Sequence, residues 1–135
     1  MIVVDANIIL YAVVTSPETT LARLVARRDP DWLVPPLWRY EVTNVLATLT
    51  RHKRIRPDLA EAALIDAENL VGGGERPIDQ VTVLRAALRL GISSYDAQYI
   101  ALAHGYDVRC VSADAPLVRK ASPIAVSPAE FVAGE

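Results

Sequence analysis

Apolar and polar residues follow one another along the chain in blocks that predict alternating strands and helices. Residues 2–4 form a short β-branched run, which suits a strand buried on both faces, and residues 108–111 form another apolar run of this kind. Between such runs, apolar residues recur at helical spacing. The pattern predicts strands at 2–4, 32–34, 76–78, 108–111 and 124–126, helices at 7–14, 18–28, 37–52, 58–71, 80–90, 94–104 and 115–120, and a terminal turn at 128–132.

Glycines mark several of the expected helix ends. We expect Gly72-Gly73-Gly74 to stop the helix at 58–71, and Gly105 to stop the helix at 94–104. The triple glycine does not match a phosphate-binding loop, because neither a GxxxxGK[ST] nor a GxGxxG pattern surrounds it.

The alternation of strands and helices defines the fold class. It predicts one three-layer α/β/α domain over residues 1–135, with a mainly parallel central sheet of four or five strands. Short connections and right-handed crossovers then bring the carboxyl ends of the strands to one edge. Asp5 and Asp114, which follow two buried strands, are expected to meet there.

Composition narrows the class of protein. Apolar residues make up 52% and charged residues 22% of the chain, as in an ordinary soluble globular protein. No apolar run approaches the length of a membrane span and no basic region precedes the first one, so we expect a cytoplasmic protein with no membrane partner. The single cysteine, Cys110, excludes an internal disulfide and a cysteine-rich zinc site. The net charge of −2 is unusual for a nucleic-acid-binding protein, but bound divalent cations would offset it.

Two further acids lie where apolar residues are expected. Glu41 stands on a helical stripe whose other members, at 37, 45 and 49, are leucine or valine. Either it reaches water from the edge of the stripe, or it projects into a shared pocket. Asp96 shares a helix face with Ile100 and Ala103, which points it inward. It also stands at the capping-box position after Ser93, so a capping role competes with a role in a site.

These acids predict a particular kind of site. Asp114 has an alternative role as the N-cap of the helix that follows it. However, carboxylates drawn together at one sheet edge repel, and a bound metal compensates for that repulsion. Four acids with no histidine–cysteine pattern favour Mg²⁺ or Mn²⁺ over zinc. Such a site suits metal-assisted phosphodiester hydrolysis.

Four stretches of the chain together carry a family resemblance. IVVDANIIL at the start, RYEVTNVL around Glu41, SSYDAQYIALA around Asp96 and VSADAPL around Asp114 resemble, in order and spacing, a PIN domain. Within that superfamily the chain is similar to the small VapC-type ribonuclease toxins of bacterial toxin–antitoxin pairs. The resemblance covers nearly the whole chain.

The resemblance implies an activity and roles for individual residues. It implies that Asp5, Glu41, Asp96 and Asp114 hold one or two Mg²⁺ or Mn²⁺ ions and cleave RNA as an endoribonuclease. It gives Asn7, Ser112 and Ser94 supporting or substrate-binding roles. It also implies a small VapB-type antitoxin as a partner, and a homodimer.

The basic residues offer candidate RNA contacts. Phosphate binding requires such cations, but they would equally suit a solvated helix end. Tyr95 and Tyr99 could stack on bases, although their helical spacing predicts core or interface positions first. The candidate cations are Arg39, Arg51, Lys53, Arg54 and Arg56.

Three alternatives remain beside this interpretation. A haloacid dehalogenase-like phosphatase expects a second aspartate at position 7 and a hydroxyl residue at position 9, where this chain has Asn7 and Ile9. A receiver-type signalling module expects paired acids after the first strand and a lysine after the last, and neither is present. A PIN domain outside toxin–antitoxin systems, acting as a nuclease or only as a binding scaffold in RNA processing, is the third. The complete acidic set argues against the scaffold.

Overall fold

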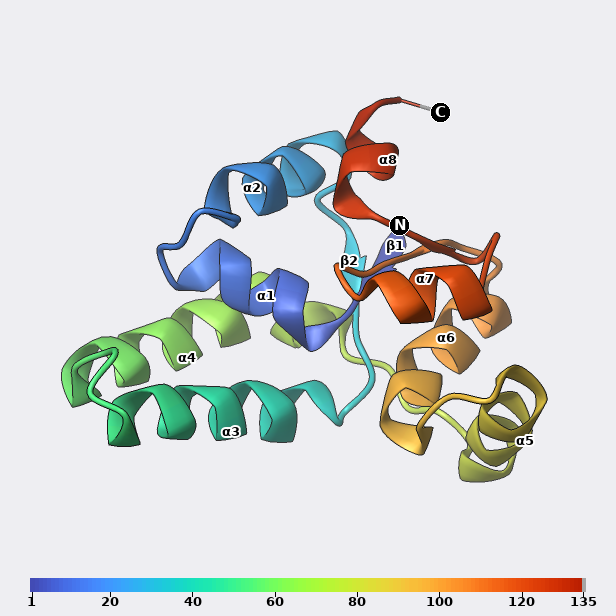
Figure 1. Cartoon of the computed structure of the whole chain (residues 1–135), viewed down its shortest axis with the longest axis horizontal. Coiled ribbons are helices and arrows are strands. Elements are labelled where there is room, and N and C mark those ends of the chain that lie inside the picture. The colour runs from blue at the N-terminus through green and yellow to red at the C-terminus, as the bar shows by residue number, and fades with distance from the viewer. Residues whose placement is uncertain (135) are drawn as a thin grey trace.

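The computed structural model describes residues 1–134 and contains a central parallel sheet covered by helices on both faces (Figure 1). The strands are β1 (Ile2–Val4), β2 (Trp32–Leu33), β3 (Cys110–Val111) and β4 (Ala125–Val126). The helices are α1 (Ala6–Val13), α2 (Thr19–Arg28), α3 (Trp38–Arg51), α4 (Pro57–Val71), the 3₁₀ turn η1 (Gly72–Gly74), α5 (Gln80–Leu90), α6 (Ser94–Tyr106), α7 (Ala115–Lys120) and α8 (Pro128–Val132). This arrangement confirms the predicted three-layer α/β/α class, with a sheet of four strands.

The strand order β2-β1-β3-β4 creates a switch point beside β1. The chain runs from β1 to β2 on one side and then crosses to β3 on the other, so β1 pairs with both. Val3 is aligned with Leu33 on one neighbour and with Cys110 on the other. In open parallel sheets, ligands bind outside the carboxyl ends of the strands at this kind of point.

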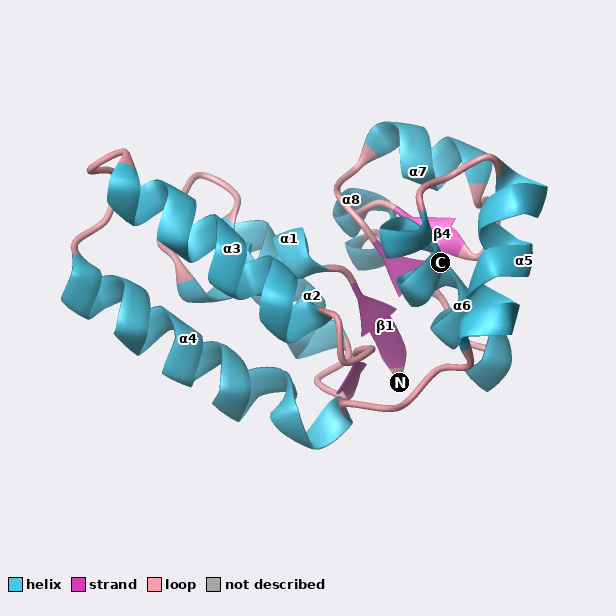
Figure 2. Ribbon diagram, turned by 90° about the horizontal axis from the view of Figure 1, so that it is seen from below, coloured by secondary structure: helices cyan, strands magenta, loops and turns pink. Residues whose placement is uncertain are grey.

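The residues of β1 divide the core into two layers because alternate side chains of a strand point to opposite faces. Ile2 and Val4 pack in a cluster with residues of α1, α3 and α4, whereas Val3 packs with residues of α6 and α7. Figure 2 shows β1 between these two groups of helices. The buried β-branched run at 2–4 therefore has the two-sided burial that its composition predicts.

The fifth strand predicted at 76–78 is wrong. Only an isolated parallel bridge forms there, between Val34 and Glu75, with the amide of Val34 bonded to the carbonyl of Gly74 at 3.0 Å. The amide of Arg76 bonds the carbonyl of Val34 at 2.9 Å. The next residue, Pro77, has no N–H, so the ladder cannot continue.

One predicted helix end is confirmed and another differs. Helix α4 ends at Val71, as predicted, with Gly72 as its C-cap, and Gly72–Gly74 follow as a separate 3₁₀ turn. Helix α6 passes through Gly105 to Tyr106 and ends at Asp107, whose left-handed backbone (φ 54°) serves as the C-cap. Aspartate adopts this conformation more readily than most residues, so a glycine is not required.

Helices α3 and α4 form a hairpin that extends away from the sheet (Figure 1). Its loop holds the basic segment 51–56 at the far end of the hairpin. Within residues 1–134, no helix has the length and apolar character needed to cross a membrane.

Gly74 gives a test of the packing against the sheet edge. A Cβ at this position would lie 1.8 Å from the carbonyl oxygen of Trp32, which is backbone and cannot move aside. We expect Gly74→Ala to lower the free energy of unfolding by roughly 2 kcal/mol or more, as overpacking does. Gly73→Ala is the matched control, because nothing lies within 4 Å of a Cβ there. Equal urea unfolding midpoints for the two variants would contradict this account.

Candidate functional site

Asp5 lies at the carboxyl end of β1, at the switch point of the sheet. Its amide bonds the carbonyl of Val111 at 3.3 Å, which continues the pairing of β1 with β3. Its carboxylate caps α1 by accepting a hydrogen bond from the amide of Ile8, at 3.3 Å from Oδ1. The residue is only 8% exposed. The backbone on both sides of Asp5 therefore fixes its carboxylate at the edge of the sheet.

Ser112 and Asp114 occupy the corresponding place after β3. The Asp114 carboxylate caps α7 through the amide of Leu117, at 3.3 Å from Oδ1. The Ser112 hydroxyl is fully buried and accepts the amide of Asp114 at 3.1 Å. Asp114 thus has the capping role considered from the sequence, and its position still places its charge near that of Asp96.

Glu41 reaches the site from α3 and meets Tyr99 of α6. The Tyr99 hydroxyl donates a hydrogen bond of 2.6 Å to Glu41 Oε1. Tyr99 is buried, and burial together with the Glu41 charge raises the pKa of its hydroxyl, which therefore remains a donor. This bond holds one oxygen of a half-buried carboxylate.

The helical spacing predicts a core or interface position for Tyr99, which is buried, but it does not predict the contact with Glu41. One signal was present in the sequence. Tyr99 stands three residues after Asp96, on the same face of its helix. A buried tyrosine hydroxyl requires a partner, and a nearby carboxylate is a strong acceptor.

Asp96 lies in the first turn of α6 and does not need its carboxylate for capping. The hydroxyl of Ser93, rather than that of Ser94, caps the helix by accepting the Asp96 amide at 3.0 Å. Ser94 is exposed in the first position of the helix. The two interpretations of Asp96 are therefore compatible, because the cap uses its backbone.

The four acids influence one another electrostatically. Burial raises the pKa of Asp5 from 3.8 to about 6, the Ser112 side chain and the Ile8 amide oppose that rise, and the charges of Asp96 and Glu41 add to it. Burial also raises the pKa of Glu41, opposed by the Tyr99 hydroxyl and increased by Asp96. The pKa of Asp96 is raised by burial and then by the charge of Asp114. The fold thus brings all four carboxyl groups into one region of negative charge.

The donor set fits a hard divalent cation, although the side chains do not form a closed cage. Within residues 1–134, no three His, Cys, Asp or Glu side chains lie close enough to hold one ion between them. Magnesium is usually bound by one or two carboxylates, with water and phosphate as the other ligands. No lysine or arginine of the described chain forms an ion pair with these acids. Their repulsion is therefore left for a cation to relieve.

Asn7 lies two residues after Asp5, in the exposed first turn of α1. It lines one end of a groove of about 1050 Å³ between α1, α3 and α4. Lys53, Arg54 and Arg56 line the same groove at the loop between α3 and α4. The groove therefore connects the start of α1 with the basic loop, and its walls are mainly apolar.

The basic candidates differ in how far their charges are already neutralised. Arg56 pairs with Asp58, and Arg51 bonds the Thr48 hydroxyl. Among residues 1–134, Arg51, Lys53 and Arg54 form no ion pair. Three of the candidates in this segment therefore have exposed charges that no acid of the described chain neutralises.

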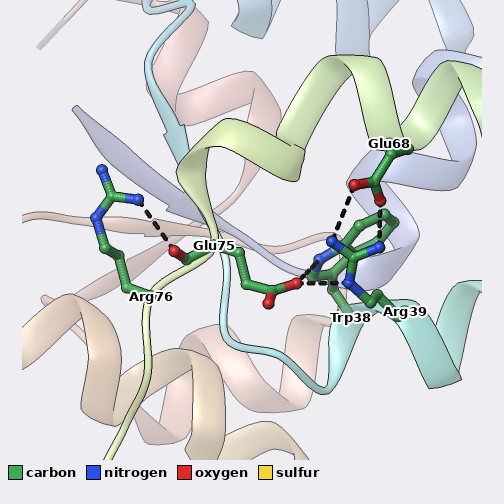
Figure 3. A network of polar contacts seen from close by, with 5 residues as sticks. All are labelled: Trp38, Arg39, Glu68, Glu75 and Arg76. Carbon is green, nitrogen blue, oxygen red and sulfur yellow. Dashed lines mark hydrogen bonds and ion pairs between the residues drawn. The ribbon is translucent and has the colours of Figure 1, made fainter.

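Arg39 joins α3 to two neighbouring segments (Figure 3). Its guanidinium makes a two-pronged pair with Glu68 of α4, and its Nε donates to Glu75 Oε1 at 2.7 Å. The indole of Trp38 donates to the same oxygen at 2.8 Å, and the guanidinium lies 5.0 Å from the Trp38 ring centroid. Because two carboxylates already neutralise Arg39, its charge is poorly suited to binding a phosphate.

The Glu75 contact can be separated from the Glu68 contact by mutation. Glu75→Ala leaves the buried Trp38 indole without its acceptor, which costs about 1–3 kcal/mol of unfolding free energy. Glu68→Ala is the control, since its pair with Arg39 is 43% and 46% exposed and such pairs contribute about 0–1 kcal/mol. Urea unfolding would measure both. A larger loss in Glu68→Ala would contradict the assignment.

The raised pKa of Asp5 predicts how stability depends on pH without divalent cations. The folded chain takes up this proton at a pH of about 6 and the unfolded chain at about 3.8, so protonation stabilises the fold as the pH falls between these values. Above pH 6 the ionised carboxylate destabilises the fold by roughly 2–3 kcal/mol, given about 1.36 kcal/mol per pKa unit.

We therefore expect Asp5→Asn to be more stable than the wild type in EDTA at pH 8. The advantage should shrink as the pH falls toward 4, and urea unfolding across this range measures it. An advantage independent of pH would show that the Asp5 charge is not its cause. Added Mg²⁺ should stabilise the wild type more than the variant.

Comparison with known proteins agrees with this geometry. No curated protein sequence matches the chain significantly. Among solved structures, PAE2754 from Pyrobaculum aerophilum has a TM-score of 0.78 at 21% identity, with 98% of this chain and 86% of that chain covered. FitAcB from Neisseria gonorrhoeae has a TM-score of 0.67 at 18% identity, covering 95% of this chain and 98% of that one. FitAB bound to an IR36 DNA fragment has a TM-score of 0.69 at 17% identity, with 95% of each chain covered.

These similarities show the fold, and a family model adds the family. The PIN domain model matches residues 2–122, which include all four acids of the cluster. PIN domains are typically metal-dependent nucleases. The match removes the haloacid dehalogenase and receiver alternatives. This chain belongs to the PIN domain family.

Proposed function

We propose that the chain is a Mg²⁺- or Mn²⁺-dependent endoribonuclease and the toxin of a VapBC-type toxin–antitoxin pair. The observation that supports the proposal is the mutual proximity of Asp5, Glu41, Asp96 and Asp114. The charges of Glu41 and Asp96 raise the pKa of Asp5, and the charge of Asp114 raises that of Asp96. Such a cluster has little structural use and fits the binding of cations.

In this proposal the four acids hold one or two ions. A bound ion supplies an activated water and neutralises charge on the phosphate during hydrolysis. Asp5 contributes a rigid carboxylate, because both its amide and one carboxylate oxygen are held by the backbone around it. Tyr99 holds Oε1 of Glu41, which leaves the other oxygen of that carboxylate to face a ligand. Ser112 favours the ionised form of Asp5 and fixes the turn that carries Asp114.

The groove from Asn7 to the basic loop is the path that we propose for RNA. Lys53 and Arg54 are its strongest phosphate contacts, since both line the groove and neither is paired with an acid. Arg51 does not line the groove and Arg56 is paired with Asp58, so both have a weaker role. The acids would bind an RNA phosphate only through bound cations. The basic loop would therefore attract the RNA at one end of this path, and metal ions at the acid cluster would bind it at the other. Asn7 and Ser94 are proposed to contact substrate near the cluster.

The toxin assignment adds two protein partners. A VapB-type antitoxin lying in the apolar groove between α1, α3 and α4 would cover the proposed RNA path. FitAB was solved with DNA. With a net charge of −2, the present chain has little general attraction for a duplex, so a partner would supply DNA binding. For the homodimer, α5 offers exposed apolar side chains at Val81, Leu84 and Leu88.

Cleavage of RNA by the purified chain tests the enzymatic part. We expect cleavage that EDTA abolishes and that Mg²⁺ or Mn²⁺ restores. Asp5→Asn should reduce it by at least roughly a hundredfold, since even the partners of metal ligands contribute about 10–100-fold. Asp107→Asn is the matched control, because this exposed acid caps α6 outside the cluster and asparagine tolerates the same backbone. Full activity of Asp5→Asn, or equal loss in both variants, would contradict the proposed centre.

Growth measurements separate the toxin from another PIN nuclease. Expressed alone, the wild type should slow growth, and Asp96→Ala should relieve the effect at the same protein level. Metal-dependent cleavage without toxicity would favour a nuclease of RNA processing. RNA binding without cleavage would favour the scaffold.

A further inference from the structure

A second cavity, of about 350 Å³, lies on the side of α1 that faces α2, α7 and α8. Most of its wall is apolar, with Leu21 and Val118 among the lining side chains. Tyr11 lines this cavity as well as the groove that leads to the basic loop. The ring of Tyr11 therefore lies between the two hollows.

This cavity is lined by residues that contact or neighbour two acids of the cluster. Ile8, whose amide bonds the Asp5 carboxylate, lines it. So do Ser112 and Ala113, which connect β3 to Asp114. Burial raises the pKa of Tyr11, and the charges of Glu18 and Asp5 raise it further, so this ring lies within electrostatic reach of both acids. A group bound in the cavity would thus contact Ile8 and Ser112, which themselves hydrogen-bond the Asp5 carboxylate.

The charged residues at the cavity limit what it can hold. Glu18 and Glu130 line it together with Arg119. Two carboxylates disfavour a phosphate, but they accept hydrogen bonds from the N–H groups at the edge of a nucleobase, and an arginine donates to its carbonyl or ring nitrogen. The apolar walls and the Tyr11 ring suit the flat faces of such a base. The volume lies in the range of small-ligand pockets.

We propose that this cavity is a nucleobase subsite, which binds the base next to the phosphate that the acid cluster cleaves. The base stacks on the ring of Tyr11, and its edge meets Glu18, Arg119 and Glu130. Through this contact the enzyme selects the nucleotide at the cleavage position. The subsite rests on the proposed ribonuclease function for its substrate, but its affinity for a base does not depend on catalysis.

Free nucleosides test the subsite without metal or phosphate. We would add guanosine, adenosine, cytidine and uridine separately, in EDTA, to the ¹⁵N-labelled protein and follow its amide signals. The expected result is a shift of the Ile8, Tyr11, Ala113 and Val118 signals, larger for one nucleoside than for the others. Tyr11→Leu should weaken binding about tenfold, as loss of a stacking partner does, and Tyr11→Phe should keep it.

A second variant guards against a folding defect in Tyr11→Leu. Ala113 is exposed and lines the cavity, so Ala113→Leu adds bulk at its wall without disturbing the core. It should also weaken nucleoside binding about tenfold. The subsite is overturned if no nucleoside shifts these signals, or if both Tyr11→Leu and Ala113→Leu, once their folding is confirmed by circular dichroism, bind like the wild type.

An abasic RNA distinguishes failure of the subsite from failure of the nuclease. Removing the base beside the cleaved phosphate should raise KM about tenfold for the wild type, and much less for Ala113→Leu. Cleavage of intact and abasic RNA with equal KM would overturn the subsite while the nuclease assignment stands. Tyr11-dependent nucleoside binding by a protein that cleaves no RNA would overturn the nuclease assignment and leave the subsite in place.

Discussion

The burial of one carboxylate, that of Asp5, is the constraint on which the rest of the structure depends. The strand before it is buried on both faces, and the helix after it begins on its side chain, so Asp5 cannot withdraw toward water without disturbing both. Three further acids face the same region, and their charges add to the effect of burial. In the absence of a cation, the ionised acids therefore lower the free energy of unfolding. Such stored repulsion indicates function, because an apolar residue would pack there more stably.

The repulsion also explains why α3 is attached so firmly. Glu41 faces Asp5 and Asp96, so the helix that carries it is pushed away from the sheet. Tyr99 opposes this on the inner face by its hydrogen bond to the carboxylate. Two residues earlier, Arg39 ties the same helix to α4 and to Glu75, and Glu75 is anchored by the bridge to Val34. The ion pairs of Arg39 and the hydrogen bond from Tyr99 together hold Glu41 near the other acids, against their mutual repulsion.

The local pattern of apolar and polar residues predicts much of the fold. It also predicts that the four acids lie near one another, because each follows a strand or stands on the apolar face of a helix. Where two roles competed, as for Asp96 and Asp114, the structure shows that capping and facing the cluster coexist. The partners could not be predicted in the same way. Tyr99 lies 58 positions from Glu41, and Glu75 lies 36 positions from Arg39, so no short-range spacing links them. The wrong strand prediction at 76–78 has the same cause. Pairing in this segment depends on Val34, which is distant in the sequence, and only one bridge to it forms, at Glu75.

Net charge was a misleading guide for a related reason, because it averages over charges that the fold separates. The acids converge at the carboxyl edge of the sheet, and the uncompensated cations lie at the far end of the α3–α4 hairpin. A chain of net charge −2 can therefore present a negative region at the edge of the sheet and a positive loop at the end of the hairpin. A polyanion approaching from the loop would meet attraction first and repulsion last. Under the proposed function, divalent cations in the cluster would make the final contact favourable, so a metal would be a condition for binding as well as for chemistry.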